Sequence, residues 1–167
     1  MNVMNSIFHR VSVRKFKKDP VKSVDVEWLM RAAMASPSAC NQQPWEFYVV
    51  RDEAVIEALS KCSPYSGCAA GAPLVIVPCY RTEGLIAPEF QEIDLSIAAE
   101  NILLEADSLG YGAVWLAIAP NAERMANVAG VLKLPANLKP FCLIPVGVPA
   151  EIHNQPNRFD PTRVHEI

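Results

Sequence analysis

The segment Ser36-Pro-Ser-Ala-Cys-Asn-Gln-Gln-Pro-Trp45 connects a predicted helix to the apolar run that ends at Val50. It concentrates hydroxyl and amide side chains between two prolines, which restrict the backbone of the loop. Amide side chains both donate and accept hydrogen bonds, so they can bind the edge of a planar heterocycle or satisfy the backbone of their own loop. These ten residues alone leave both interpretations open.

The composition predicts one globular domain over residues 1–167, because the chain has 51% hydrophobic and 20% charged residues. The net charge of −3 and the absence of a basic run argue against nucleic acid as a partner. No apolar run is long enough to span a membrane, and no signal peptide is apparent. Five cysteines without a C-x-x-C pair favour a reducing, cytoplasmic location. The three histidines lack metal-ligand spacing, so no metal site is predicted.

Hydrophobic periodicity predicts alternating helices and short strands. Helices are expected over 23–35, 53–61 and 91–109 and after Asn121, and strands over 45–50, 73–79, 112–118 and 141–147. Ser23, Asp52 and Asn121 are the expected N-caps, and Gly110 is expected to end the long helix. This alternation predicts an α+β or α/β sandwich around one sheet.

Several segments carry more specific expectations. Val24 and Trp28 are expected on the apolar face of the 23–35 helix, and the 91–109 helix is apolar on most of its surface, as in a core or a subunit interface. Pro145 argues for a sheet edge or a bulge in the last strand. Residues 66–72 and 81–90 are expected to be loops, the first of them mobile. The proline-containing tail 149–167 is expected to be extended and to lie on a partner subunit.

The segment Arg10-Val-Ser-Val-Arg14 alternates with period two, which places Arg10, Ser12 and Arg14 on one side of an extended chain. Two guanidinium groups beside a hydroxyl suit a phosphate, because arginine binds oxyanions through two parallel hydrogen bonds. The same pattern is also compatible with a solvated edge strand. No dinucleotide-binding glycine motif, P-loop, serine elbow or paired carboxylates are present, so no catalytic acid–base side chain is assigned.

Taken together, these motifs resemble the FMN-dependent nitroreductase family, in particular its short members of about 170 residues. The resemblance is carried by Arg10-x-Ser-x-Arg14, the loop from Pro37 to Trp45, Asp94 ahead of Ala99-Glu-Asn-Ile-Leu-Leu-Glu-Ala106, Leu109-Gly-Tyr-Gly-Ala-Val-Trp-Leu116 and Arg158-Phe-Asp-Pro-Thr-Arg-Val-His165. The five motifs occur in order and span nearly the whole chain.

The resemblance implies an α+β sandwich with a mainly antiparallel central sheet, working as an intertwined homodimer with FMN at the interface. Arg10, Ser12 and Arg158 would hold the FMN phosphate, and Arg14 would approach the pyrimidine side of the ring. Pro37, Ser38, Ala39 and Asn41 would come from the other subunit. The backbone of Leu116 and Ala117 would approach flavin N5.

The activity that the resemblance implies is ping-pong hydride transfer from NAD(P)H through FMN to a small-molecule oxidant. Flat, electron-poor acceptors are expected, such as nitroaromatics, quinones or flavins. A non-catalytic protein that senses, stores or delivers FMN is the alternative, because it would need the same binding residues. The sequence departs from the family pattern in three places. Residues 62–72 contain no basic side chain, Ala117 replaces a common glycine, and the segment His165-Glu-Ile167 lacks the aromatic residue common in short members.

Overall fold

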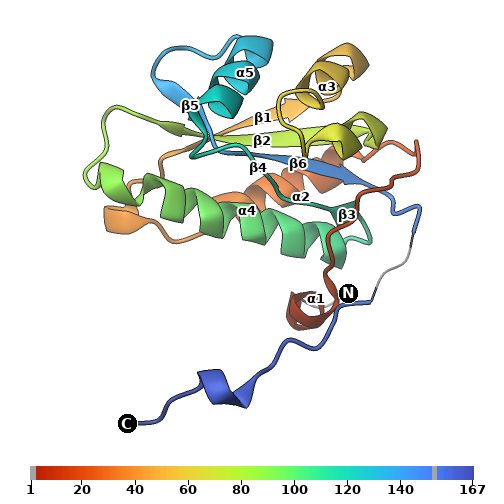
Figure 1. The fold of residues 1–167 in the computed structure, drawn as a ribbon, viewed down its shortest axis with the longest axis vertical. Coiled ribbons are helices and arrows are strands. Elements are labelled where there is room, and N and C mark those ends of the chain that lie inside the picture. Colours follow the sequence, from red (N-terminus) through yellow and green to blue (C-terminus); the bar gives the residue numbers. More distant parts are fainter. Residues whose placement is uncertain (1–2, 152–153) are drawn as a thin grey trace.

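A single antiparallel sheet forms the centre of the molecule, which is known here from a computed structural model describing residues 3–151 and 154–167 (Figure 1). Its strands are β1 (Trp45–Val50), β2 (Leu74–Arg81), β3 (Gly112–Ala113), β4 (Leu116–Ala117), β5 (Leu138–Pro140) and β6 (Cys142–Gly147). The strand order is β1-β2-β6-β3, with β4 also pairing with β6 and β5 with β2. Each of these pairings is antiparallel, which confirms the predicted α+β class.

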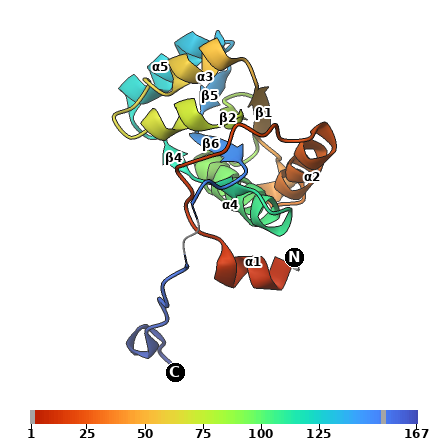
Figure 2. The same ribbon diagram turned by 90° about the vertical axis from the view of Figure 1, so that its right-hand side faces the viewer.

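Two helical layers cover the sheet. The helices α2 (Ser23–Met34) and α4 (Gln91–Ser108) lie on one face, and α3 (Glu53–Leu59) and α5 (Ala122–Leu132) lie on the other (Figures 1 and 2). Because β2 and β6 lie between the layers, both strands are almost completely buried, as their continuous apolar sequences predict. The short helix α1 (Val3–His9) packs against α4. None of the described helices combines the length and apolar character that crossing a membrane requires.

Local capping follows the sequence with one exception. The side chains of Asp52 and Asn121 accept hydrogen bonds from the first turns of α3 and α5, as predicted. Gly110 has a φ of +83°, the left-handed conformation expected after a helix. The prediction for Ser23 was wrong, because Ser23 is the first helical residue and Lys22 occupies the N-cap position.

The predicted apolar face of α2 was also wrong. Val26, Leu29 and Ala33 point into the core, whereas Val24 and Trp28 are 58% and 52% exposed. The buried residues and the exposed apolar residues are both spaced three or four positions apart along α2. Periodicity alone therefore did not determine which of the two sets faces α4.

The predicted strand 112–118 is split into β3 and β4, which pair with β6 in the same register on either side of a gap. Pro145 lies in β6 opposite this gap, and proline lacks the N–H that would continue the ladder. The expected sheet edge was therefore wrong, because β6 is an interior strand with β2 on its other side. The proline interrupts a neighbouring strand instead.

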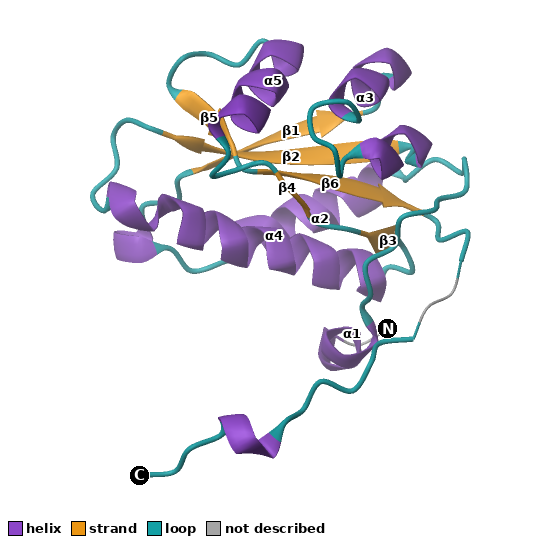
Figure 3. Ribbon diagram, in the orientation of Figure 1, coloured by secondary structure: helices purple, strands orange, loops and turns teal. Residues whose placement is uncertain are grey.

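The loop segments contain short 3-10 helices: η1 (Ala39–Asn41), η2 (Gly67–Gly71), η3 (Pro88–Phe90) and η4 (Pro161–Arg163) (Figure 3). Residues 66–72 were expected to be a mobile loop, but most of them form η2, in which Ala69 is fully buried in the core. The tail is largely extended, and from residue 154 onward it leads away from the sheet and its helices (Figure 2). Phe159 is 74% exposed there.

Candidate functional site

The predicted phosphate-binding segment runs beside the end of the sheet. Ser12 forms a parallel bridge with Ala113, and the Val13 N–H donates to the Ala113 carbonyl at 3.0 Å. The absence of a side chain at Gly112 makes this approach possible, since a Cβ there would lie 2.6 Å from the Val13 side chain. The residue that approaches Gly112 is therefore Val13.

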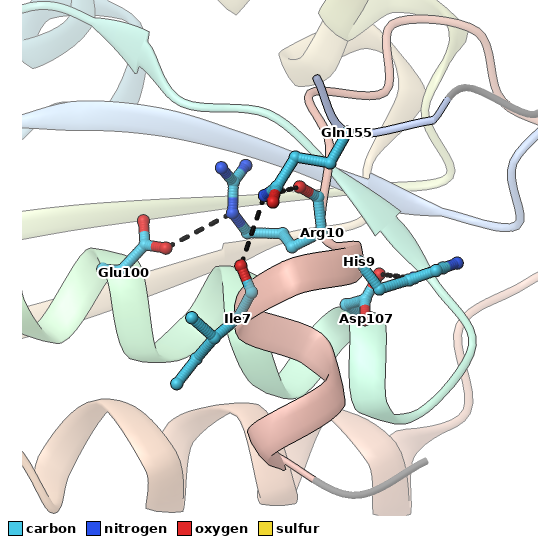
Figure 4. A network of polar contacts seen from close by, with 6 residues as sticks. All are labelled: Ile7, His9, Arg10, Glu100, Asp107 and Gln155. Carbon is cyan, nitrogen blue, oxygen red and sulfur yellow. Dashed lines mark hydrogen bonds and ion pairs between the residues drawn. The ribbon is translucent and has the colours of Figure 1, made fainter. Parts of the chain in front are cut away.

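Arg10 is anchored at its backbone and at one nitrogen of its side chain. Gln155 donates to the carbonyls of Arg10 and Ile7 at 2.9 and 3.2 Å, and the Arg10 Nε lies 3.3 Å from Glu100 Oε1. Figure 4 shows the two terminal nitrogens of Arg10 pointing away from Glu100. Arg158 lines the same groove of about 550 Å³ as Arg10. Two of the predicted phosphate ligands therefore share one groove.

Arg14 follows the bridged residue Ser12, and its charge acts on Cys68 in η2. Its Nη1 is 3.5 Å from the Ser12 carbonyl. Burial raises the pKa of the Cys68 thiol, and the nearby positive charge of Arg14 partly opposes this rise. The segment without basic residues, 62–72, is thus placed next to a cation from the N-terminal segment.

The loop after α2 is held in a strained conformation. Cys40, Asn41 and Gln43 have φ values of +51°, +53° and +46°, a region that non-glycine residues seldom occupy. The Ser38 hydroxyl accepts a hydrogen bond from the Gln43 N–H at 3.0 Å. Asn41 Oδ1 accepts from the Gln43 side chain at 2.9 Å, and both residues remain exposed.

Asp94, in the first turn of α4, fixes this loop. One carboxylate oxygen accepts from the Ala39 N–H at 2.9 Å, and the other accepts from Gln42 Nε2 at 2.7 Å. Gln42 also exchanges two hydrogen bonds with the backbone of Ala87. Asp94 is only 2% exposed. The two interpretations of the amide-rich loop therefore apply to different residues: Gln42 satisfies buried groups, whereas Asn41 faces outward.

Asp94 and Gln42 were not predicted as site residues. The available signal was an acidic residue at the start of a helix, where the macrodipole favours negative charge. That signal does not reveal which loop the carboxylate contacts.

At β4 the backbone becomes accessible. Leu116 is buried at 6% exposure and Ile118 is fully buried, but Ala117 between them is exposed. Arg124 Nη1 lies 3.3 Å from the Ala117 carbonyl, and the Arg124 guanidinium carbon is 5.1 Å from the centre of the Tyr65 ring. Neither Arg124 nor Tyr65 was predicted as a site residue, because they come from different elements without a shared motif.

The structure thus forms two groups of predicted site residues within one chain. The first group lies around the N-terminal segment and consists of Arg10, Ser12, Arg14 and Arg158. This segment contacts β3, and β4 follows β3 in the chain. Pro37, Ser38, Ala39 and Asn41 are fixed at Asp94. Asp94 and Glu100 are six residues apart on α4, about 9 Å along its axis, and they project from different sides.

Other ionisable groups offer no alternative centre. Within residues 3–151 and 154–167, no cluster of three or more His, Cys, Asp or Glu side chains has the arrangement of a metal site. Burial raises the pKa of Cys79 to about 12 and that of Cys142 well above its ordinary value. Both thiols therefore stay protonated and unreactive at neutral pH.

Comparison with known proteins places this arrangement in a family. The sequence profile of the Nitroreductase family matches residues 7–64 and 63–148. A protein of Methanothermobacter thermautotrophicus, provisionally assigned as an NADH dehydrogenase/NAD(P)H nitroreductase, is 37% identical over 99% of this chain and 86% of its own length.

Two solved structures share the fold. A Clostridium acetobutylicum protein, provisionally assigned as an NADH oxidase, is 44% identical with a TM-score of 0.92, and 98% of each chain is covered. A Desulfovibrio desulfuricans protein, provisionally assigned as a nitroreductase and solved in complex with FMN, is 27% identical with a TM-score of 0.85 over 100% of this chain and 97% of its own. The profile match, the sequence identities and the shared fold together show that the chain belongs to the nitroreductase family.

Proposed function

We propose that this protein is an FMN-dependent NAD(P)H oxidoreductase that reduces flat, electron-poor acceptors such as nitroaromatics, quinones or flavins. The observation that supports it best is the alignment of the Arg10–Arg14 segment along β3, from which the chain continues to the exposed residue Ala117. One edge of the sheet thereby offers cations for a phosphate and accessible backbone for the edge of a ring.

The residues present fit an FMN molecule. Arg10 has terminal guanidinium nitrogens directed away from its carboxylate partner (Figure 4). Arg158 lines the same groove as Arg10. These two residues, with the Ser12 hydroxyl, would hold the phosphate. A bound flavin would supply hydride transfer between NAD(P)H and the acceptor.

The protein's own contribution is positioning and electrostatics. Arg14 would lie beside the pyrimidine side of the ring and stabilise negative charge that develops there on reduction. Leu116 and Ala117 would orient the other edge through their backbone. These roles need no acid–base side chain.

We further propose that the active form is a homodimer in which Pro37, Ser38, Ala39 and Asn41 of one subunit complete the site of the other. The exposed Phe8, Ile93 and Phe159 support this proposal, because large apolar side chains that are 76%, 56% and 74% exposed favour a protein contact. The extended tail would lie on the partner. All five cysteines are unpaired, so we place the reaction in the cytoplasm.

The proposal is tested by purifying the protein and identifying its released cofactor from the visible spectrum and by chromatography. NADH and NADPH oxidation is then measured with menadione and with a nitrofuran. Bound FMN with acceptor-dependent turnover is the expected result. Bound FMN without turnover would indicate a storage or delivery protein, and a colourless monomer that does not take up FMN would refute the proposal.

A further inference from the structure

Arg124 and Tyr65 form a solvent-accessible cation–π pair beside the candidate flavin site. The Tyr65 ring is 70% exposed and carries the Arg124 guanidinium at 5.1 Å. Within the described residues, 3–151 and 154–167, no carboxylate forms an ion pair with Arg124. Its guanidinium contacts the Ala117 carbonyl and the Tyr65 ring, and neither group carries a formal charge.

Both partners of this pair are held in place by their local structure. Ser66 is fully buried, and its hydroxyl donates within the turn to the carbonyls of Ser60 and Ser63 at 2.8 Å, while the Tyr65 N–H donates to Ser63 Oγ at 3.2 Å. The Arg124 N–H is capped by the Asn121 side chain at 3.0 Å. The guanidinium is therefore presented from a fixed helix end against a fixed turn.

The location of the pair connects it to the reaction. Ala117, whose backbone is expected at the reactive edge of the flavin, is 3.3 Å from Arg124 Nη1. Three residues beyond Tyr65, Cys68 lies within the electrostatic influence of Arg14. The segment from Tyr65 to Cys68 is therefore near Arg124 at one end and under the influence of Arg14, the proposed flavin-binding residue, at the other.

Arg124 also lines a polar groove with a volume of about 270 Å³. Its other lining residues include Lys61, Asn121, Glu123 and Asn127. Lys61 forms an ion pair with Glu57 at 2.9 Å. Among the described residues, Arg124 is therefore the cation of this groove without an ion pair, and Glu123 adds one negative charge to the same lining.

We propose that Arg124, supported by Tyr65, is a specificity-determining residue that binds the pyrophosphate of the nicotinamide dinucleotide. This inference rests on the proposed function. Hydride transfer requires the nicotinamide ring to lie at the reactive edge of the flavin. In NAD(P)H a single ribose separates this ring from the pyrophosphate, so the pyrophosphate would lie close to the same edge. Arginine suits that group because its planar guanidinium binds phosphate oxygens in a bidentate manner. An uncharged acceptor such as a quinone gains nothing from this contact, so the pair acts on the electron donor.

The test compares two donors that differ in the pyrophosphate. NADH carries it, whereas 1-benzyl-1,4-dihydronicotinamide presents the same hydride-donating ring without phosphate. For Arg124→Ala and Arg124→Gln we expect a KM for NADH at least tenfold higher than that of the wild type. The kcat/KM for the benzyl compound should stay within twofold. Arg124→Lys should recover part of the loss, and Tyr65→Ala should raise the KM for NADH several-fold.

An equilibrium measurement provides a readout independent of turnover. Calorimetric titration of the FMN-loaded protein with NAD⁺, which cannot donate a hydride, should show a dissociation constant about tenfold higher in Arg124→Gln. The matched control is Arg31→Ala, because Arg31 also stacks on an aromatic ring, Trp28, at 5.7 Å but lies on α2 on the opposite face of the sheet. The control should leave both donors and NAD⁺ binding unchanged.

The outcomes separate the two proposals. If the wild type binds FMN and oxidises both donors, but Arg124→Gln leaves NADH and NAD⁺ binding unchanged, the inference is overturned and the proposed function stands. Equal losses for both donors, or loss of FMN, would also overturn it, because Arg124 would then act through the Ala117 backbone. A wild type that oxidises neither donor overturns the proposed function and this inference with it.

Discussion

At the scale of single residues, Arg14 is the side chain whose charge matters most for the proposed chemistry. It lies beside the Ser12 carbonyl, its charge acts on Cys68, and its proposed role is to stabilise the negative charge of reduced flavin. For Arg14→Ala we expect weaker FMN binding and a more negative midpoint potential, measured by equilibrium titration and by dye-linked potentiometry. Arg163→Ala, which removes an exposed arginine from the tail, is the control for net charge. An unchanged midpoint potential would contradict the placement of Arg14.

Tyr80 predicts how stability depends on alkaline pH. Burial, followed by the charge of Glu92 and the hydrogen bond to it, raises the Tyr80 pKa from about 10 to about 12. Between these values the unfolded chain loses the phenolic proton while the folded chain keeps it. The contribution to stability is therefore complete below pH 10 and is lost as the pH rises towards 12.

Tyr80→Phe tests this dependence, because it removes the ionisation and keeps the ring. At pH 8 the variant should be less stable than the wild type by about 1 kcal/mol, the typical value of the hydrogen bond that Tyr80 donates to Glu92. Urea denaturation at pH 8, 10 and 11 should show this difference shrinking as the pH rises. A constant difference across the series would show that Tyr80 does not titrate as described.

At the scale of elements, the contact between the Arg10–Arg14 segment and β3 depends on Gly112. A methyl group at this position would lie 2.6 Å from the Val13 side chain, which is itself buried. We expect Gly112→Ala to lower the free energy of unfolding by about 1–3 kcal/mol, the usual cost of overpacking, and to weaken FMN binding. The double variant Gly112→Ala/Val13→Ala should regain part of the FMN affinity. If the double variant binds FMN no better than Gly112→Ala, the Val13 contact does not cause the loss.

The attachment of the strained loop to α4 gives a second prediction at this scale. Asp94→Asn would turn an acceptor facing Gln42 into a donor, while its other oxygen could still accept from Ala39. Unfolding experiments should show a loss of about 2 kcal/mol, in the range for hydrogen bonds to charged groups, together with weaker FMN binding. Glu89→Gln removes the same charge from an exposed position of η3 and should be neutral. Equal stability of the two variants would contradict the anchoring role of Asp94.

At the scale of the whole molecule, the central question is whether two chains build each site. Arg10 and Asn41 belong to separate groups within one chain, anchored at Glu100 and Asp94. If each site combines Arg10 of one subunit with Asn41 of the other, co-expressed Arg10→Ala and Asn41→Ala chains form mixed dimers with one intact site. Differently tagged chains allow these dimers to be isolated, and about half of the wild-type activity is expected. Complete inactivity of the mixed dimers would place both residues in the same subunit's site.

The sequence by itself determined the main strand segments, the main helices and most of their ends, but it did not predict β5 or the division of 112–118 into β3 and β4. It did so because periodicity and capping are local properties, as Asp52, Asn121 and Gly110 show. Local rules failed where a partner from elsewhere in the chain decided the outcome. They did not reveal that Trp28 faces outward, or that Pro145 lies in an interior strand and interrupts its neighbour.

The candidate site likewise contains residues that local motifs suggest and contacts that only the tertiary structure shows. Arg10, Ser12, Arg14 and the 37–41 loop could be proposed as site residues from the sequence, because each motif is contiguous and resembles a family motif. Only the tertiary structure showed that Asp94 holds Ala39 and Gln42, and that Arg124 lies between Tyr65 and the Ala117 carbonyl. Contacts between residues so far apart in sequence are decided by how the helices pack on the sheet, and no local pattern encodes that packing.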